Sequence, residues 1–584
     1  MNRIKPQRVL VKTNEILLKE NGEWLHFSEP HRIIAAEKLE DVLPALLEIE
    51  QLIKVNNWYA AGFLSYEAAS AFEPALQTKP EIGFPYLWFG LYSGPRAIAL
   101  PKPVGQKDTL TWEPSVDPET YNAAIAQIRD DIGEGRTYQV NYTMRLQTDF
   151  TGNAWDFFLQ LAQNQNSHAA YLEMGRYIIC SASPELFFQL DGDTITCRPM
   201  KGTAKRGRTT SEDSAQSEWL KHSAKNRAEN VMIVDMVRND LGRIAEIGSV
   251  CVPELFGTER YPTLWQMTST VTARTNATLT EIFSALFPCA SITGAPKVST
   301  MRIIKELEAT PRRVYTGSIG YISPPRKAKF NVAIRTVLID RETRQAEYGV
   351  GGGIVWDSTS TDEYAEALLK ARVLTEPPPQ FSLLETMLWT PETGFYLLDQ
   401  HLARMLDSAD YFDFPTSKEK IQEYLEHLSS AFHSPQRVRL LLDPTGAFQS
   451  QAATYQPGAP DQPLNICIAK EPVDSRNVFL FHKTTQRDVY EFALRDFPGT
   501  DDVLLYNELG ELTEFTNGNL VVELEGKLCT PPISCGVLPG TFRAHLLETG
   551  QVVERAILVE QLKDCTKVFR VNSVRRWQRV QIKG

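Results

Sequence analysis

Hydrophobic and polar residues alternate along this chain with two different periods. In residues 223–241, 363–374 and 397–412, apolar side chains recur at three- or four-residue spacing, which predicts amphipathic helices. Residues 330–339 instead alternate between two faces, and residues 503–524 read as strands around a turn; period-two alternation predicts β-structure. Helices and strands mix in both parts of the chain without a regular βαβ rhythm, so the expected fold class is α+β.

One linker divides the sequence. The chain has 584 residues, which is too long for one ordinary hydrophobic core. Residues 376–380 contain three consecutive prolines, which cannot continue a helix and form a stiff, extended spacer. We therefore expect one domain over residues 1–375, the linker at 376–380, and a second domain over 381–584.

Composition and charge exclude several classes of protein. The chain is 42% hydrophobic and 23% charged, with a net charge of -11, so we expect no general role in binding nucleic acid. Its eight cysteines are scattered, without a CxxC pair or zinc-type spacing, which favours reduced thiols. Neither a signal-like N-terminus nor an apolar run of membrane-spanning length is present. We expect a cytoplasmic protein with no membrane partner.

Two features of the first part point to bound anions and cations. Residues 349–353 are dense in glycine, which indicates either a flexible turn or exposed backbone N–H groups that bind a carboxylate or phosphate. Glu363 and Glu366 share one helix face, and Glu229 lies on another helix. Carboxylates from two helices suit magnesium, although any one of them alone is more simply a solvated residue.

Two further segments add polar chemistry. Residues 291–297 are rich in turn-forming residues and lead into a helix, with Pro296 suited to its first turn. Arg335 occupies a strand face among apolar residues, where an arginine usually pairs with an anion.

These segments resemble the chorismate-utilising enzymes, a family that includes anthranilate, aminodeoxychorismate, isochorismate and salicylate synthases. The matching motifs occur in the family's order. They lie at residues 135–141, 183–186, 228–230, 235–242, 291–297, 315–320 and 351–358. The resemblance implies two α/β subdomains around a β-sandwich, with chorismate and magnesium between them.

The segment Pro199-Met200-Lys201-Gly202-Thr203 distinguishes the branches of this family. Anthranilate synthases resemble it but carry alanine at the position of Lys201, whereas aminodeoxychorismate synthases carry lysine. A partly desolvated lysine can be neutral and nucleophilic, and the resemblance implies that Lys201 adds to C2 of chorismate before ammonia attacks C4. If Lys201 instead acted as a base that activates water, the enzyme would be an isochorismate synthase. The remaining alternative is that Lys201 is a surface lysine without a catalytic role.

The same resemblance assigns roles to other residues of the first part. Glu185 matches the acid/base carboxylate that protonates the leaving hydroxyl. Gln266 stands where many relatives have histidine, which makes pyruvate elimination in this part less favoured because glutamine is not an acid. The implied substrate-binding residues are Thr293, Gly294, Tyr315, Arg335, Gly351, Gly352 and Gly353. The implied metal ligands are Glu229, Glu363 and Glu366.

The second part contains Lys483, Arg404, Glu514 and the segment Leu538-Pro539-Gly540-Thr541. Each has a simple structural explanation, but together they resemble the fold-type-IV pyridoxal-phosphate enzymes, which include aminodeoxychorismate lyase and branched-chain aminotransferase. The resemblance implies that Lys483 bonds the cofactor, Glu514 pairs its pyridine nitrogen, and Arg404 binds its phosphate.

In the same resemblance, Leu538 and Thr541 mark the helix start that adds backbone N–H groups to the cofactor site. These residues do not separate a lyase from an aminotransferase. A lyase is favoured because it would consume the product of the first part.

The combined expectation is a two-domain enzyme that makes 4-aminobenzoate from chorismate for folate biosynthesis. None of the eight cysteines fits a glutaminase nucleophile, so we expect a separate glutamine amidotransferase subunit to supply ammonia. A homodimer through the second domain is a further expectation. The alternatives are another chorismate enzyme fused to an aminotransferase, and a second domain that serves only in assembly.

Overall fold

The computed structural model describes residues 11–101, 110–163, 168–371, 374, 379–457 and 462–582. The chain forms two compact units. One contains residues 1–205 and 217–378, and the other contains residues 206–216 and 379–584. Most of the predicted linker, 376–378, lies outside the described residues. No helix among the described residues is long and apolar enough to cross a membrane.

The first unit contains two antiparallel sheets of ten strands each. The first sheet has the order β16 (Gly294–Ala295), β8 (Gln139–Asp149), β20 (Gln345–Ile354), β19 (Thr336–Asp340), β10 (Tyr177–Ser183), β9 (His168–Glu173), β1 (Glu15–Glu20), β2 (Glu23–Phe27) and β6 (Arg96–Ile98), with β7 (Glu113–Pro114) beside β8. The second has the order β13 (Met200–Lys205), β15 (Leu264–Arg274), β12 (Thr194–Arg198), β11 (Leu186–Asp191), β18 (Lys327–Val332), β17 (Ser318–Ser323), β4 (Tyr59–Leu64), β5 (Leu87–Tyr92) and β3 (Arg32–Ala36), with β14 (Cys251–Arg260) beside β15.

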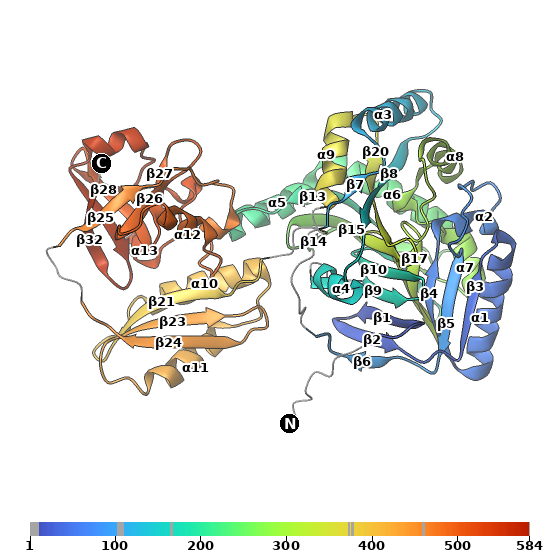
Figure 1. The fold of residues 1–584 in the computed structure, drawn as a ribbon, viewed down its shortest axis with the longest axis horizontal. Coiled ribbons are helices and arrows are strands. Elements are labelled where there is room, and N and C mark those ends of the chain that lie inside the picture. The colour runs from blue at the N-terminus through green and yellow to red at the C-terminus, as the bar shows by residue number, and fades with distance from the viewer. Residues whose placement is uncertain are drawn as a thin grey trace. The chain divides into compact units, whose positions relative to one another are not determined.

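The two sheets pack face to face, with helices on their outer sides (Figure 1). The inner core joins residues of both sheets, including Ile16, Leu172, Phe63 and Trp88. The helices of this unit are α1 (Val42–Asn56), α2 (Ala69–Phe72), α3 (Pro118–Gly133), α4 (Ala154–Gln163), α6 (Ala224–Gly242), α7 (Leu279–Leu286), α8 (Lys297–Leu307) and α9 (Ser360–Ala371). This layered sandwich confirms the fold expected for the first domain.

The second unit contains a smaller sheet and a larger one. The smaller has the order β22 (Gly394–Phe395), β21 (Leu383–Thr390), β23 (Gln436–Leu442) and β24 (Phe448–Thr454). The larger has the order β27 (Leu512–Phe515), β26 (Asp502–Tyr506), β25 (Leu464–Ile468), β32 (Arg576–Ile582), β31 (Lys567–Asn572), β28 (Gly518–Leu524), β29 (Lys527–Thr530) and β30 (Val553–Glu554). The helices are α10 (Leu398–Phe412), α11 (Lys418–Ser429), α12 (Asp488–Arg495) and α13 (Thr541–Glu548).

A helix that begins in the second unit, α5 (Thr210–His222), continues into residues of the first. The predicted helices at 223–241 and 397–412 correspond to α6 and α10, since each has one apolar face to bury. The helix predicted at 363–374 begins earlier, at Ser360.

The strand predicted at 330–339 is wrong as one element, because it is interrupted between Val332 and Thr336. Arg335 lies in this interruption with φ 50°, a left-handed conformation that no regular strand accommodates.

Candidate functional site

Strand β13 carries Lys201 at the end of the second sheet. Side chains on both sides hold its backbone: the Asn230 amide donates to the Lys201 carbonyl at 3.3 Å, and Gln266 donates to the Gly202 carbonyl at 2.9 Å. The Lys201 amine reaches the glycine strand of the other sheet, because a β-carbon on Gly353 would lie 2.6 Å from its Nζ. The fold thus brings Lys201 and Gly353 together, and only glycine leaves room for the amine.

Burial lowers the pKa of Lys201, while the Glu229 and Glu185 carboxylates offset part of that shift. Desolvation disfavours the ammonium form because a charge is less stable away from water. Lys201 is therefore a neutral amine in a larger fraction of the protein molecules, and the neutral amine is the nucleophilic form.

Glu185 lies just before β11 and is 3% exposed. The Ser291 hydroxyl donates a hydrogen bond of 2.6 Å to its Oε1. Burial raises the pKa of Glu185 to about 7, against the lowering effects of Ser291 and Lys201. A carboxyl with this pKa can donate or accept a proton at neutral pH.

The glycine-rich segment is a strand, so the flexible turn considered from the sequence is wrong. Gly351, Gly352 and Gly353 lie on β20, opposite Thr143, Tyr142 and Asn141 of β8. On its other side β20 pairs with β19 only from Gln345 to Tyr348.

Beyond Tyr348, the described residues provide no strand on that side of β20. Lys370 Nζ donates to the Gly351 carbonyl at 2.9 Å. Backbone groups on this side of β20 can therefore face a ligand, as expected if the glycines expose N–H groups that bind a carboxylate or phosphate.

Arg335 is a half-buried cation without an ion-pair partner in the part of the chain that the structure describes. Its position is not a strand face but the left-handed residue between β18 and β19. Burial lowers the pKa of Arg335, and Tyr348 and Tyr261 offset part of this effect. Because a buried guanidinium is unfavourable without a counterion, this site suits an anionic ligand.

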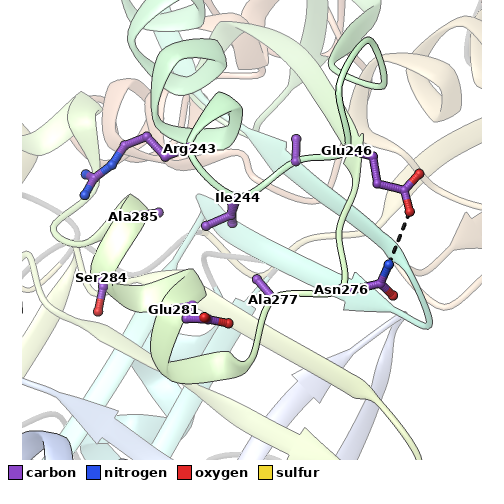
Figure 2. Close-up of a pocket in the computed structure, with 9 residues that line it drawn as sticks. Arg243, Ile244, Glu246, Asn276, Ala277, Glu281, Ser284 and Ala285 are labelled. Atoms are coloured by element: carbon purple, nitrogen blue, oxygen red, sulfur yellow. Dashed lines mark hydrogen bonds between the residues drawn. The ribbon is translucent and has the colours of Figure 1, made fainter.

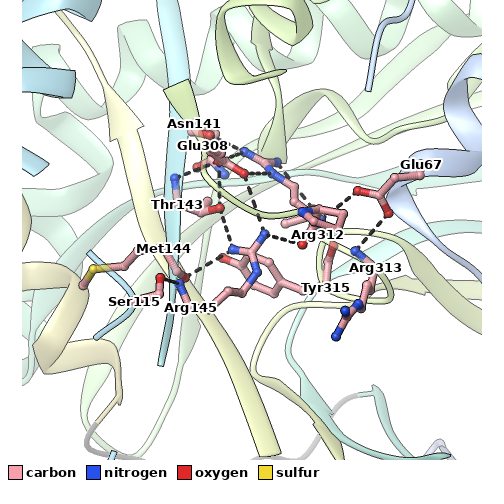
Figure 3. Close-up of polar contacts among 12 residues, drawn as sticks. Glu67, Ser115, Asn141, Thr143, Met144, Arg145, Glu308, Arg312, Arg313 and Tyr315 are labelled. Atoms are coloured by element: carbon pink, nitrogen blue, oxygen red, sulfur yellow. Dashed lines mark hydrogen bonds and ion pairs between the residues drawn. The ribbon is translucent and has the colours of Figure 1, made fainter. Parts of the chain in front are cut away.

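Tyr315 is fixed by a buried polar network (Figure 3). The Arg145 guanidinium lies 5.1 Å from the centre of its ring. Glu308 accepts hydrogen bonds from Arg312 at 2.6 and 2.9 Å and from the Thr143 hydroxyl at 2.8 Å. Burial raises the pKa of Tyr315 to about 12, so its phenol stays protonated at neutral pH.

Thr293 and Gly294 shape the adjacent turn. The buried Thr293 hydroxyl donates to the carbonyls of Cys289 and Ala290 at 3.1 and 3.2 Å, so its hydrogen is used within the turn. Gly294 has φ 137° and belongs to β16, which pairs with β8. Pro296 precedes the first residue of α8 and is its N-cap, not part of its first turn.

The three predicted metal ligands do not form a ligand cluster. Glu363 accepts a hydrogen bond from Ser358 at 2.7 Å, and Glu366 pairs with Lys370 at 2.9 Å. Burial raises the pKa of Glu363; it acts the same way on Glu366, but nearby lysines, chiefly Lys370, outweigh it and lower that pKa.

Within the described ranges, no group of three or more His, Cys, Asp or Glu residues could hold a metal ion. Glu366 can serve as a magnesium ligand only when it leaves Lys370, so the magnesium site stays a prediction.

Gln139 is a site residue that sequence reasoning missed. It is 1% exposed, and both its side-chain oxygen and nitrogen lack hydrogen-bond partners among the described residues. A β-carbon added to Gly353 would touch the Gln139 amide as well as the Lys201 amine, so these two side chains face the same glycine. Since an unpaired buried amide is costly, this side chain is available to a ligand. Its membership of the 135–141 motif was the only signal in the sequence.

In the second unit, Lys483 precedes α12 beside strand β21. Its carbonyl accepts the Leu384 N–H at 2.9 Å, and Leu383 forms a bridge with Thr484. Burial lowers the pKa of Lys483 to about 8, with a smaller contribution from Arg404. A lysine with this pKa has an accessible neutral amine near neutral pH.

Glu514 is buried on β27 and has two partners that the sequence did not reveal. The Tyr490 hydroxyl donates to its Oε1 at 2.7 Å, and Asn519 donates to its Oε2 at 3.0 Å. Burial raises the pKa of Glu514 to about 7. A cationic partner would restore its charged form, which is what a pyridine nitrogen that shares a proton provides.

Arg404 on α10 is already paired. It donates two hydrogen bonds to Glu385 at 2.8 and 2.6 Å, and one to the Pro539 carbonyl at 3.1 Å. Burial opposes ionisation of Glu385, but Arg404 and His401 outweigh it and hold the pKa of this carboxyl at about 2. Arg404 therefore carries no uncompensated charge for a phosphate.

Leu538 and Thr541 frame the start of α13. The Leu538 carbonyl accepts hydrogen bonds from the Asn519 amide at 2.8 Å and from the Gly540 N–H at 2.7 Å. Thr541 is the first residue of the helix, and its hydroxyl lies 3.4 Å from His401 Nε2. The first N–H groups of this helix remain suited to an anion.

An open hollow of about 580 Å³ lies away from all the predicted site residues (Figure 2). It is lined by the end of α6 and by α7, with Arg243 and Glu281 among its residues. Glu246 accepts a hydrogen bond from Asn276 at 3.2 Å across one side. No unpaired buried group among its described residues points to a ligand.

Comparison with known proteins agrees with this arrangement. The sequence model of the chorismate binding enzymes matches residues 12–376. The chain belongs to this family. The model of class IV amino-transferases matches residues 382–582. Both resemblances inferred from the motifs are thereby confirmed. The class IV family implies pyridoxal phosphate in the second unit.

Similar proteins with assigned names match the first unit. Aminodeoxychorismate synthase component 1 of Escherichia coli strain K12 is 42% identical over 272 residues, which cover 46% of this chain and 60% of that protein. The protein of the same name from Bacillus subtilis strain 168 is 39% identical over 254 residues, covering 43% and 54%. The matches thus span little more than half the length of these relatives.

A solved structure matches more of the chain. Anthranilate synthase component I from Streptococcus pneumoniae TIGR4 superposes with a TM-score of 0.52 and 27% identity, covering 64% of this chain and 94% of that one.

Proposed function

We propose that this chain converts chorismate and ammonia to 4-amino-4-deoxychorismate, and then eliminates pyruvate to give 4-aminobenzoate for folate biosynthesis. The observation that carries the proposal is the Lys201 amine against Gly353, with a pKa that desolvation lowers. An alanine at this position would leave no nucleophile. The name that the relatives share, aminodeoxychorismate synthase component 1, supports the same reaction.

In the first reaction, the neutral Lys201 amine attacks C2 of chorismate. The two ring double bonds shift, and the C4 hydroxyl leaves as water with a proton from Glu185, whose pKa of about 7 suits that transfer. Ammonia then attacks C4, the double bonds shift back, and the Lys201 amine is expelled from C2. The ring diene and the enolpyruvyl ether are restored, and Glu185 takes up a proton from the new ammonium group.

Arg335 and the open edge of β20 would bind the carboxylates of chorismate. Arg335 is half-buried and has no ion-pair partner among the described residues, so an anionic substrate would supply a counterion. Tyr315, fixed by Arg145 and kept protonated by its raised pKa, would donate a hydrogen bond to the same ligand. The glycines of β20 leave room for this ligand beside Lys201.

In the second reaction, Lys483 would hold pyridoxal phosphate, which when bound acts as an electron sink for the carbon that bears the amine. Lys483, with its lowered pKa of about 8, would remove the C4 proton. The C3–O bond then breaks, enolpyruvate leaves and takes up a proton to become pyruvate, and the ring becomes aromatic. Glu514 would pair the pyridine nitrogen, and the start of α13 would face the phosphate.

Four further expectations belong to this proposal. Magnesium would bind through Glu229, Glu363 and Glu366, which requires Glu366 to leave Lys370. A separate glutamine amidotransferase subunit would supply the ammonia. The second unit would form a homodimer, and the protein would act in the cytoplasm.

Paired lysine variants test the proposal. Lys201→Ala should abolish amination of chorismate while chorismate still binds. Lys205→Ala, an exposed lysine on the same strand, should leave the rate within a factor of about two, because a surface substitution changes little. Lys483→Ala should stop pyruvate release but not amination, with the exposed Lys470→Ala as its control. Amination by Lys201→Ala at the normal rate would refute the first reaction.

A further inference from the structure

The second unit includes a short segment from the middle of the chain, Arg206–Gln216. The segment begins directly after β13 and contains the first turns of α5. Asp213 fixes its shape by accepting hydrogen bonds from Arg206 Nε at 2.7 Å and from the Gly207 N–H at 2.9 Å.

Two arginines attach this segment to the rest of the second unit. Arg206 donates to the Tyr411 carbonyl at 2.9 Å and lies 4.3 Å from the centre of the Tyr411 ring. Arg208 donates to the carbonyls of Ser475 and Ser534, both at 3.3 Å, and lies 5.0 Å from the centre of the Phe481 ring. Each guanidinium thus combines carbonyl acceptors with an aromatic face, which are the contacts that arginine makes best.

The backbone of the segment reaches the residue next to Lys483. The Tyr411 hydroxyl donates to the Gly207 carbonyl at 2.7 Å. His482 Nε2 lies 3.2 Å from the Arg208 carbonyl, and His482 Nδ1 lies 2.9 Å from the Ser408 hydroxyl. Because a carbonyl can only accept, Nε2 carries the hydrogen and Nδ1 accepts from Ser408.

Packing holds the His482 ring in addition to its hydrogen bonds. It is 2% exposed, and its centre lies 4.4 Å from that of the Tyr411 ring and 4.9 Å from that of the Phe412 ring. Burial lowers the pKa of His482 to about 4, so the ring is neutral at working pH and keeps one tautomer.

We propose that residues 206–216 are a positioning element of the second unit: the Arg208 carbonyl orients His482 and thereby the backbone from which Lys483 extends. The cofactor role of Lys483 rests on the proposed function, but the docking of the segment does not. The Leu384 N–H donates to the Lys483 carbonyl at 2.9 Å and fixes one side of this backbone, and the neighbouring His482 fixes the other.

Hydrogen exchange of the full-length protein, read by mass spectrometry, tests the docking. Arg208→Ala removes the two hydrogen bonds to the Ser475 and Ser534 carbonyls and the ring contact, together with the ion pair to Glu212 inside the segment. It should speed exchange in residues 472–486 about thirtyfold, since the two hydrogen bonds to the rest of the unit are each worth about 1 kcal/mol net. Tyr411→Phe, which deletes one hydroxyl, should give about a fivefold change. The exposed Arg476→Ala, a loss of the same charge in the same stretch, should change little. Equal exchange in Arg208→Ala and the unaltered protein would overturn the docking.

The positioning of Lys483 has its own readout. Pyridoxal phosphate is added to the cofactor-free protein, and the labelling of Lys483 is trapped with borohydride across a range of pH. When Arg208→Ala admits water to this backbone, the pKa of Lys483 should rise toward its ordinary value, and the labelling midpoint should move to higher pH. An unmoved midpoint despite faster exchange would overturn the positioning role. No label at Lys483 in the unaltered protein would refute the proposed cofactor site, while the exchange result still decides the docking.

Discussion

Replacing Glu185 with glutamine removes an acid and keeps its size. Glu185 is 3% exposed, and the Ser291 hydroxyl can donate to an amide oxygen as it does to Oε1 at 2.6 Å. Burial raises the pKa of this carboxyl from 4.5 to about 7. At about 1.4 kcal/mol for each pH unit, the folded protein disfavours the carboxylate by about 3 kcal/mol.

The sign of the pH dependence follows from this raised pKa. Below pH 7 the folded protein holds the Glu185 proton, and an acid is available for the leaving hydroxyl. As pH rises from 4.5 to about 7, the unfolded chain has lost this proton while the folded protein retains it, so the contribution of Glu185 to stability falls. Above pH 7, Glu185→Gln should therefore be more stable than the unaltered protein by up to about 3 kcal/mol.

The assay is the rate of aminodeoxychorismate formation at saturating chorismate and constant free ammonia across neutral pH. The unaltered protein should lose activity as pH rises through about 7. Glu185→Gln should be slower by a factor of about 10² to 10⁴ and should lack this decline. Glu119→Gln, an exposed residue in the first turn of α3, should match the unaltered protein. If Glu185→Gln kept both the rate and the decline near pH 7, the acid assignment would be refuted.

Three other predictions concern cofactors and ammonia. Glu366→Gln should raise the magnesium concentration needed for half-maximal amination at least tenfold, because it removes one charged ligand; full activity after exhaustive chelation would exclude the metal. Borohydride reduction and peptide mapping should place pyridoxal phosphate on Lys483, and Glu514→Ala should slow pyruvate release more than it weakens cofactor binding, since the pyridine contact tunes the electron sink; a label on another lysine would sink this assignment. Amination should proceed with ammonium salt but hardly with glutamine until a glutaminase subunit is added, and efficient use of glutamine by this chain alone would contradict the proposed partner.

Local periodicity predicted the helices well but not the interrupted strand. Val234, Val237 and Leu241 recur at helical spacing in the sequence and are buried on α6, whereas Val231 of the same pattern is exposed. Residues 330–339 alternate just as regularly, yet Arg335 takes a left-handed conformation. Hydropathy does not encode φ, so the break between β18 and β19 is invisible in the pattern.

The sequence predicted which residues belong to the candidate site better than it predicted which of them contact each other. Lys201 and Gly353 are distant in sequence, and only the packing of two sheets brings them together. The burial of Gln139 and the pairing of Arg404 with Glu385 also depend on contacts between separate elements. For the same reason, no pattern indicated that residues 206–216 belong to the second unit.

Product analysis of the purified protein tests the central claim most directly. The protein would be incubated with chorismate, ammonium, magnesium and pyridoxal phosphate, and the products separated and identified. The account predicts 4-aminobenzoate and pyruvate in equal amounts, with aminodeoxychorismate accumulating in Lys483→Ala. Anthranilate or isochorismate as the product, or aminodeoxychorismate that the unaltered protein never consumes, would contradict it.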